Sequence, residues 1–146
     1  MNGHHDPRRL QRLRQQREVT EMLLHRAEAL APRDAALLRA VLGDGKPARE
    51  VAVLLGLPAG GERAIRRHVS RLISRLTSPE FLVVLRHSQT WPAPCRRVAT
   101  ACVLHGLSIR AASRSLGISL HQVRAARAAV RALVEAASTL SPKEAA

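Results

Sequence analysis

The stretch REVAVLLGL, from Arg49 to Leu57, returns in altered form as RAASRSLGI, from Arg110 to Ile118. A shift of about sixty residues aligns small and apolar positions through both copies, and it places Gly45 opposite Gly106. A helical stretch rich in arginine follows each copy. We interpret this pattern as two helix-turn-helix units in one chain, which predicts an all-α fold with an N-terminal helix ahead of the units.

The domain organisation follows from this repeat and from the positions of proline. A chain of 146 residues has room for two units, because one unit with its supporting helix needs only about 50 residues. The expected segments are a helical leader over 1–31, a first unit with a connecting segment over 32–91, a second unit over 92–137 and a flexible tail over 138–146. The boundary near Pro92 rests on Pro92 and Pro94, since two prolines so close together cannot continue a helix across them.

The leader is predicted to be helical from about Pro7 to Leu30, with Pro32 as its stop. A loose apolar stripe along this helix leaves two alternatives, a self-associating coiled coil or a helix that packs on its own domain and frays without a partner. The heptad pattern fails at Arg17 and Thr20, which favours the second alternative.

Three helices are expected in the first unit. Asp34 is expected to cap a short helix that ends at the turn Gly43-Asp44-Gly45. The second helix covers about 48–55, and Gly56 then adopts a left-handed conformation so that the chain doubles back. The third covers about 63–76, with an apolar stripe on one side and arginines on the other. The buried residues expected on the second helix are Val51, Ala52, Leu54 and Leu55.

The second unit is predicted to repeat this order. Residues 81–85 form a connecting element that periodicity allows to be a helix or a buried strand, and helix is favoured because no partner strand is visible. Helices are expected over about 95–105, 109–116 and 120–137. Ser108 and Ser119 are the expected N-caps, and Ser119 with Gln122 makes a capping box.

Charge and aromatic content indicate the kind of partner. The formal net charge is +13, although the bias to arginine over lysine is typical of GC-rich genomes. No Asp or Glu occurs from Phe81 to Val134, whereas eight arginines do. Phe81 and Trp91 are the only aromatic residues, which argues against the stacking surfaces of single-strand binders. Duplex DNA is therefore the predicted partner.

The last helix has the composition of a recognition helix. The N-terminal residues of such a helix lie near base edges in the major groove, where Gln bonds adenine and Arg bonds guanine, while more distal arginines meet phosphates. The alternative is a solvated arginine face on a helical bundle. The predicted base-reading residues are His121, Gln122, Arg124 and Ala125, and the distal arginines are Arg127 and Arg131.

The stretch LAPRDAALLRAVLGDGKPAREVAVLLGL, Leu30 to Leu57, resembles region 4, the promoter-binding C-terminal domain of bacterial RNA-polymerase sigma factors. Glu50-Val51-Ala52 stands where that family has an acid, an apolar residue and alanine. The resemblance implies a four-helix domain whose last helix reads promoter DNA and whose flanks touch the polymerase. It implies DNA-facing residues in both units. In the first unit these are Arg63, Arg66, Arg67 and Ser70, to which we add the neighbouring Arg71. In the second unit they are His121, Gln122, Arg124 and Arg127.

Two departures from the family qualify this expectation. The turn over 58–62 is roughly three residues longer than its counterpart, which would swing the following helix away from a groove, and Ala111 replaces the acid in the second copy. The chain also lacks room for the aromatic-rich domain that melts promoters. We therefore expect a stand-alone bacterial regulator or adaptor, as a monomer acting as a pseudo-dimer or as a homodimer.

Other functions are less expected. Cys95, Cys102 and His105 match no zinc module, and no phosphate-binding glycine loop occurs. His25, His68 and His87 lack nearby carboxylates in the sequence that would suggest acid-base pairs. Neither enzymatic activity nor a metal or cofactor is expected. The lack of a long apolar run predicts no membrane partner and a cytoplasmic protein, which the predicted binding of DNA would associate with the nucleoid. Two alternatives stay open: a protein-interaction module that contacts RNA polymerase or another regulator, and a basic protein that coats nucleic acid.

Overall fold

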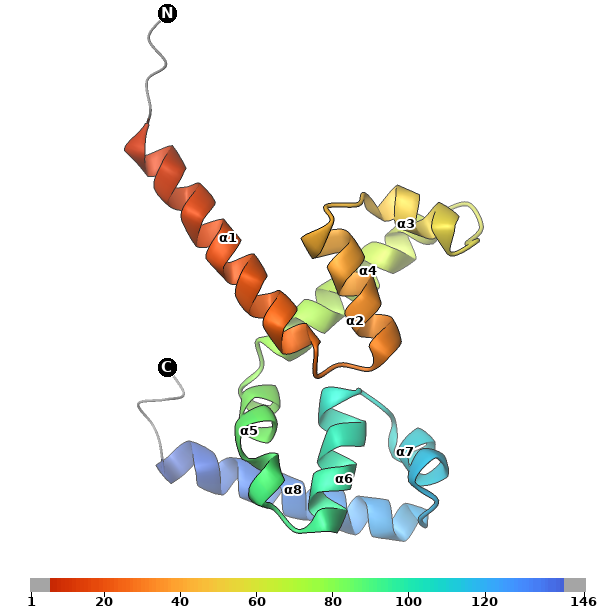
Figure 1. Cartoon of the computed structure of the whole chain (residues 1–146). Helices are drawn as coiled ribbons and strands as arrows, with labels where there is room; N and C mark the ends of the chain where they lie inside the picture. The colour runs from red at the N-terminus through yellow and green to blue at the C-terminus, as the bar shows by residue number, and fades with distance from the viewer. Residues whose placement is uncertain (1–5, 141–146) are drawn as a thin grey trace, which may run out of the picture. The chain divides into compact units, whose positions relative to one another are not determined.

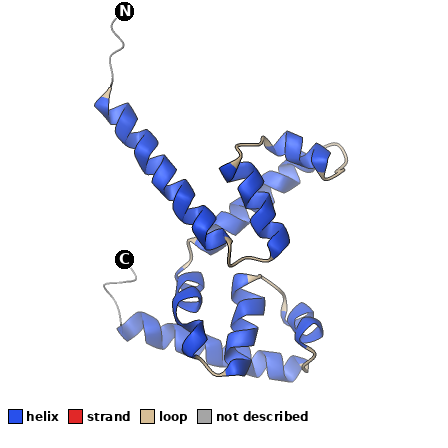
Figure 2. Ribbon diagram, in the orientation of Figure 1, coloured by secondary structure: helices blue, strands red, loops and turns tan. Residues whose placement is uncertain are grey.

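The computed structural model describes residues 6–140, and within this range all regular structure is helical (Figure 1 and Figure 2). That range contains eight α-helices and no strand, so the predicted all-α fold is confirmed. The chain divides into two compact units. Unit 1 holds the residues through Glu28 together with Pro32–Ile73, and unit 2 holds Ala29–Ala31 and the residues from Ser74 onward.

Unit 1 is built from four helices and one π-helical turn, and the last residues of α4 belong to unit 2. The helices are α1 (Pro7–Ala27), α2 (Pro32–Leu38), α3 (Ala48–Leu54) and α4 (Gly61–Leu76), and the turn over Arg39–Gly43 ends α2. Asp6 caps α1, because its carboxylate accepts a hydrogen bond from the Arg8 amide at 3.0 Å. Each helix buries one face, and the buried residues are Leu23, Ala27, Ala35, Leu38, Val51, Ala52, Ile65, Val69 and Leu72.

Unit 2 has the same plan. Its helices are α5 (Pro79–His87), α6 (Ala93–Ala99), α7 (Ile109–Leu116) and α8 (Leu120–Leu140), with a 3-10 turn over Ser88–Thr90 and a π-helical turn over Thr100–Leu104. The long helix α8 packs against α5, α6 and α7. Fully buried side chains of this unit include Phe81, Val84, Val98, Val123 and Val130.

The sequence repeat holds in three dimensions. When Gly45 is aligned with Gly106, α2 and α6 coincide from end to end, and so do the two π-helical turns. Both glycines have a left-handed φ, +67° at Gly45 and +70° at Gly106, which suits glycine. In the same alignment the second half of α1 corresponds to α5, since Leu23 and Val84 are buried at matching positions. Each unit therefore contains four helices, one more than the apolar pattern predicts for each.

The boundary between the two units does not lie near Pro92, where it was predicted. Trp91 is buried, and Pro92 precedes α6, whose first turn contains Pro94 at a position where the missing amide costs no hydrogen bond. The division lies between Ile73 and Ser74 instead. The predicted first unit, 32–91, includes α5. In the structure α5 belongs to unit 2, where Phe81 is buried.

Several local predictions differ from the structure as well. Asp34 lies inside the first turn of α2 and does not cap it; its Oδ1 is 2.8 Å from His68 Nε2 on α4, so His68 does have a carboxylate partner. α1 ends at Ala27, before the predicted Leu30. α8 continues to Leu140 and so includes the start of the predicted tail, and residues 1–5 and 141–146 lie outside the described residues.

Candidate nucleic-acid interface

Local hydrogen bonds organise the start of α8. Ser119 Oγ accepts from the Gln122 amide at 3.1 Å and Gln122 Oε1 accepts from the Ser119 amide at 2.9 Å, which confirms the predicted capping box. Ser108 caps α7 by accepting from the Ala111 amide at 3.1 Å. Between the helices, Gly117 has a φ of +67° and turns the chain. α7 and α8 thus form a helix-turn-helix arrangement with both helix starts anchored.

One side of α8 is exposed along its first half. His121, Arg124 and Ala125 are exposed and lie on one face, because residues three and four apart are neighbours on a helix. Ala128 continues this face and was missed in the sequence reasoning, although its spacing from His121 and Arg124 was the available signal. No acidic residue occurs on α8 before Glu135. Ala125 and Ala128 have short side chains. In the first half of α8, therefore, only His121 and Arg124 project from this face.

Gln122 has a structural role that competes with its predicted role as a base reader. Its side chain is exposed, but its Oε1 is the acceptor for the Ser119 amide. Bidentate recognition of adenine uses both the oxygen and the nitrogen of a glutamine amide. Gln122 therefore serves α8 as a cap partner in this structure.

The two distal arginines of α8 have different surroundings. The Arg127 side chain is only 18% exposed, and its Nη1 lies 2.7 Å from Glu80 Oε1 on α5. When the buried positions of α4 and α8 are aligned, Arg127 stands where Val69 occupies the core of unit 1. Its charge is thus directed toward Glu80 and away from the exposed face. Arg131, by contrast, is exposed.

The corresponding face of α4 carries the predicted residues of unit 1. All five are exposed: Arg63, Arg66, Arg67, Ser70 and Arg71. Arg66 forms an ion pair with Glu62 one turn earlier, with 3.8 Å between Nη2 and Oε2. Such an exposed i,i+4 pair is weak. With four arginines against one glutamate, this face of α4 is strongly positive.

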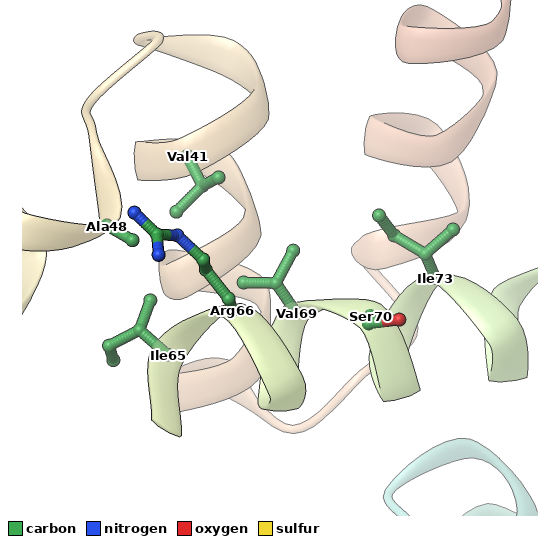
Figure 3. Close-up of a pocket in the computed structure, with 7 residues that line it drawn as sticks. All are labelled: Val41, Ala48, Ile65, Arg66, Val69, Ser70 and Ile73. Atoms are coloured by element: carbon green, nitrogen blue, oxygen red, sulfur yellow. The ribbon is translucent and has the colours of Figure 1, made fainter. Parts of the chain in front are cut away.

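A pocket of about 250 Å³ lies beside this face of α4 (Figure 3). Figure 3 shows the Arg66 guanidinium extended toward Ala48, below Val41, so that its methylene stem covers apolar surface. The methylene groups of Arg66 therefore pack on unit 1, while its guanidinium contributes to the positive face. The residues that line the pocket are Val41, Ala48, Ile65, Arg66, Val69, Ser70 and Ile73.

The turn between α3 and α4 is longer than the turn between α7 and α8, since the first covers 55–60 and the second only 117–119. Leu54 and Leu55, which were predicted to be buried, are 66% and 52% exposed. Leu116, the counterpart of Leu55, packs against the buried cluster that contains Ala112 and Val123. The longer turn leaves an open apolar groove of about 620 Å³ bordered by α2, α3 and α4.

Some arginines that contribute to the net charge have structural partners that the sequence did not reveal. Arg97 Nη2 donates to the Leu116 carbonyl at 3.3 Å, and Arg75 Nη2 donates to the Leu104 carbonyl. Both interactions satisfy carbonyls at the ends of helices, where positive charge is favourable. These contacts join residues far apart in the chain, so no local spacing indicates them.

The two cysteines are free and half-buried. Burial raises the pKa of the Cys102 thiol, and the charge of Arg127 partly offsets that increase. Among residues 6–140, no group of three or more His, Cys, Asp or Glu side chains is placed to hold a metal ion. None of the helices in the described range is long and apolar enough to cross a membrane.

Comparisons of the chain with protein-family models, curated proteins and solved structures gave no match. The strongest geometric feature is the exposed face of α8, free of acidic residues before Glu135 and presented by a helix-turn-helix arrangement.

Proposed function

We propose that the protein binds duplex DNA through α8 of unit 2 and acts in transcription control. The observation that carries this proposal is the exposed face of His121, Arg124, Ala125 and Ala128, with no acidic residue on α8 before Glu135. The major groove admits an α-helix, and small side chains let the helix approach the base edges closely. The resemblance of the first copy to sigma region 4 agrees with the proposal but concerns unit 1.

Each residue of this face has a proposed role. Arg124 bonds guanine through O6 and N7, and Ala125 contacts a thymine methyl group. His121, at the start of the helix, donates to a base edge. Arg131 lies further along α8 and meets a phosphate, which adds affinity without sequence preference.

Selection from a randomised duplex pool tests the proposal. At about 150 mM salt, the purified protein is expected to enrich one motif and to prefer it about 1000-fold over scrambled DNA. Equal affinity for every sequence, with the same steep salt dependence, would contradict sequence reading and support a coating function.

Arg124→Ala is expected to lose discrimination at one base pair of the selected site. The expected loss is about 1–3 kcal/mol, or about 5- to 150-fold, measured as the ratio of affinities for the selected site and a site mutated at that pair. The control is Arg114→Ala on α7, which removes an equal charge from an exposed position outside α8. Identical, uniform losses for the two variants would show that α8 does not read bases.

A second candidate function is docking of RNA polymerase or another protein on unit 1, and the open groove favours it. Leu54, Leu55 and Leu57 line this groove, and Val53 beside them is 73% exposed. A contiguous apolar surface of this kind on a small domain is typical of protein interfaces. The longer turn before α4 provides the physical reason, since it leaves α3 apart from α4.

The second candidate is tested with purified bacterial RNA polymerase in a direct binding assay. We expect Leu54→Glu with Leu57→Glu to weaken binding at least about 30-fold, because charges placed in a buried apolar contact disrupt it. Leu10→Glu with Leu13→Glu is the control, since these exposed leucines of α1 lie outside the groove. Absence of binding by the wild-type protein would remove polymerase as the partner.

A further inference from the structure

The first eleven residues of α1, Pro7 to Arg17, have no counterpart in unit 2. We call them the α1 extension. The alignment that matches α2 with α6 places Pro79, at the start of α5, opposite Glu18 of α1. Only the second half of α1 therefore belongs to the repeated four-helix plan, and the α1 extension is an addition to it.

The α1 extension contributes no buried residue to unit 1. All its residues are exposed, including Leu10 at 43% and Leu13 at 54%. The buried residues of α1, Leu23 and Ala27, lie near its other end. Figure 1 shows the extension projecting away from α2, α3 and α4. A helix of this length is only marginally stable in water without packing, so a partner would stabilise it.

The charge of the α1 extension is uniformly positive. It contains five arginines and no acidic residue: Arg8, Arg9, Arg12, Arg14 and Arg17. Arg12 stands four residues after Arg8 and three after Arg9, so like charges repel along the helix. These three arginines fall within a sector of about 100° at 3.6 residues per turn. Arg17 pairs with Glu21 at 3.4 Å and lies on another side.

We propose that the α1 extension is a phosphate-binding arm that lies along the backbone of duplex DNA, with Arg8, Arg9 and Arg12 as the contacting residues. The proposal rests on the proposed function, because it takes the partner to be the duplex that unit 2 binds. Duplex DNA carries one negative charge per about 1.7 Å of its axis. The extension is about 16 Å long at 1.5 Å per residue, so its three arginines can meet phosphates of one segment. Those contacts also relieve the repulsion among the arginines.

The residue pattern favours DNA over two other partners of an exposed helix. A helix that lies on a membrane surface has a broad apolar face opposite a charged one. In the α1 extension, arginines are spread over about 240° of the circumference at 3.6 residues per turn, and the only large apolar residues are Leu10 and Leu13. A coiled coil needs an apolar seam, and the seam that these leucines begin is interrupted at Arg17.

The test uses the full chain with Arg8→Gln, Arg9→Gln and Arg12→Gln combined. Its affinity for the selected duplex and for scrambled duplex is measured between about 50 and 200 mM salt. Each lost phosphate contact lowers the slope of log K against log salt by about 0.9, so three contacts lower it by about 2.7. At about 150 mM salt this corresponds to roughly 100-fold weaker binding to both duplexes, with an unchanged ratio between them. Glutamine preserves helix propensity at these exposed positions.

Two matched variants separate the phosphate arm from other roles. Arg14→Gln with Arg17→Gln removes charge from the other sides and is expected to lower the slope by less than about 1. Leu10→Ala with Leu13→Ala keeps every charge and is expected to leave the slope unchanged. An unaltered slope in the triple variant would overturn the proposal, and so would a dimeric wild type that becomes monomeric and loses DNA affinity in the leucine variant.

Failure of the arm and failure of the proposed function give different results. If α8 reads DNA but the arm makes no contact, the triple variant retains both the affinity and the discrimination of the wild type. If the wild type binds no duplex at all, the proposed function is itself contradicted. Binding of the wild type to anionic vesicles but to no duplex would assign the α1 extension to a membrane surface and overturn the arm.

Discussion

Replacing Phe81 with alanine is expected to lower the unfolding free energy of unit 2 by about 3–5 kcal/mol. Phe81 is 1% exposed and sits in the first turn of α5, where its amide donates to Ser78 Oγ at 3.2 Å. Truncation loses the transfer free energy of the ring and leaves a cavity that the surrounding helices fill only in part. Trp91 is the single tryptophan of the chain and is buried in unit 2. Urea unfolding followed by its fluorescence therefore measures this loss.

The control for Phe81→Ala is Leu85→Ala on the same helix. Leu85 is 37% exposed, so its truncation is expected to change the unfolding free energy by less than about 1 kcal/mol. A shift this small for Phe81→Ala would contradict the assignment of α5 to the core of unit 2. It would instead support the predicted division, in which the first unit covers 32–91 and includes the connecting segment.

The second large loss of stability is expected for a substitution at Gly106. The equivalent glycine of the other repeat, Gly45, provides the control. Both Gly106 and Gly45 have a left-handed φ, so alanine costs about 1–2 kcal/mol at either position. A Cβ on Gly106 would also overlap the guanidinium of Arg75, whose Nη2 donates to the Leu104 carbonyl. No atom lies within 4 Å of a Cβ built on Gly45. We therefore expect Gly106→Ala to cost about 2–4 kcal/mol and Gly45→Ala about 1–2 kcal/mol.

The two glycine variants are measured in the unfolding transitions of their own units. Trp91 fluorescence follows unit 2, and amide hydrogen exchange follows unit 1. A double-mutant cycle with Arg75→Ala then isolates the contribution of the guanidinium, because Gly106→Ala should cost less when Arg75 is already absent. Equal costs at Gly45 and Gly106 would show that Arg75 moves aside freely and contributes nothing to the difference.

The helical architecture was largely predictable from local patterns. Apolar spacing at three and four residues located α3, α4, α7 and α8 to within a few residues. The capping box of Ser119 and Gln122 and the left-handed conformation of Gly56 were also predictable, because each depends on residues close together in the chain. The repeat was visible for the same reason, since both copies use the same local rules.

The candidate site was predictable only in part. Arg124 and Ala125 are exposed as expected, because helical spacing alone separates them from the buried Val123. Arg127, like Arg124, is an arginine of α8, but it pairs with Glu80 on α5, which is far away in the chain. Its orientation depends on how α5 packs against α8, and no spacing within α8 contains that information.

Local chemistry was thus sufficient to establish the type, approximate position and order of the main helices, because helix formation, capping and turning involve residues a few positions apart. Which helices share a core depended on packing between distant segments, as the assignment of α5 to unit 2 and the Asp34 to His68 contact show. The same packing left Leu55 exposed in unit 1 and its counterpart Leu116 packed in unit 2. A difference in the length of one turn changes where the next helix can dock, and the outcome of docking is set by the whole surface that the helix meets.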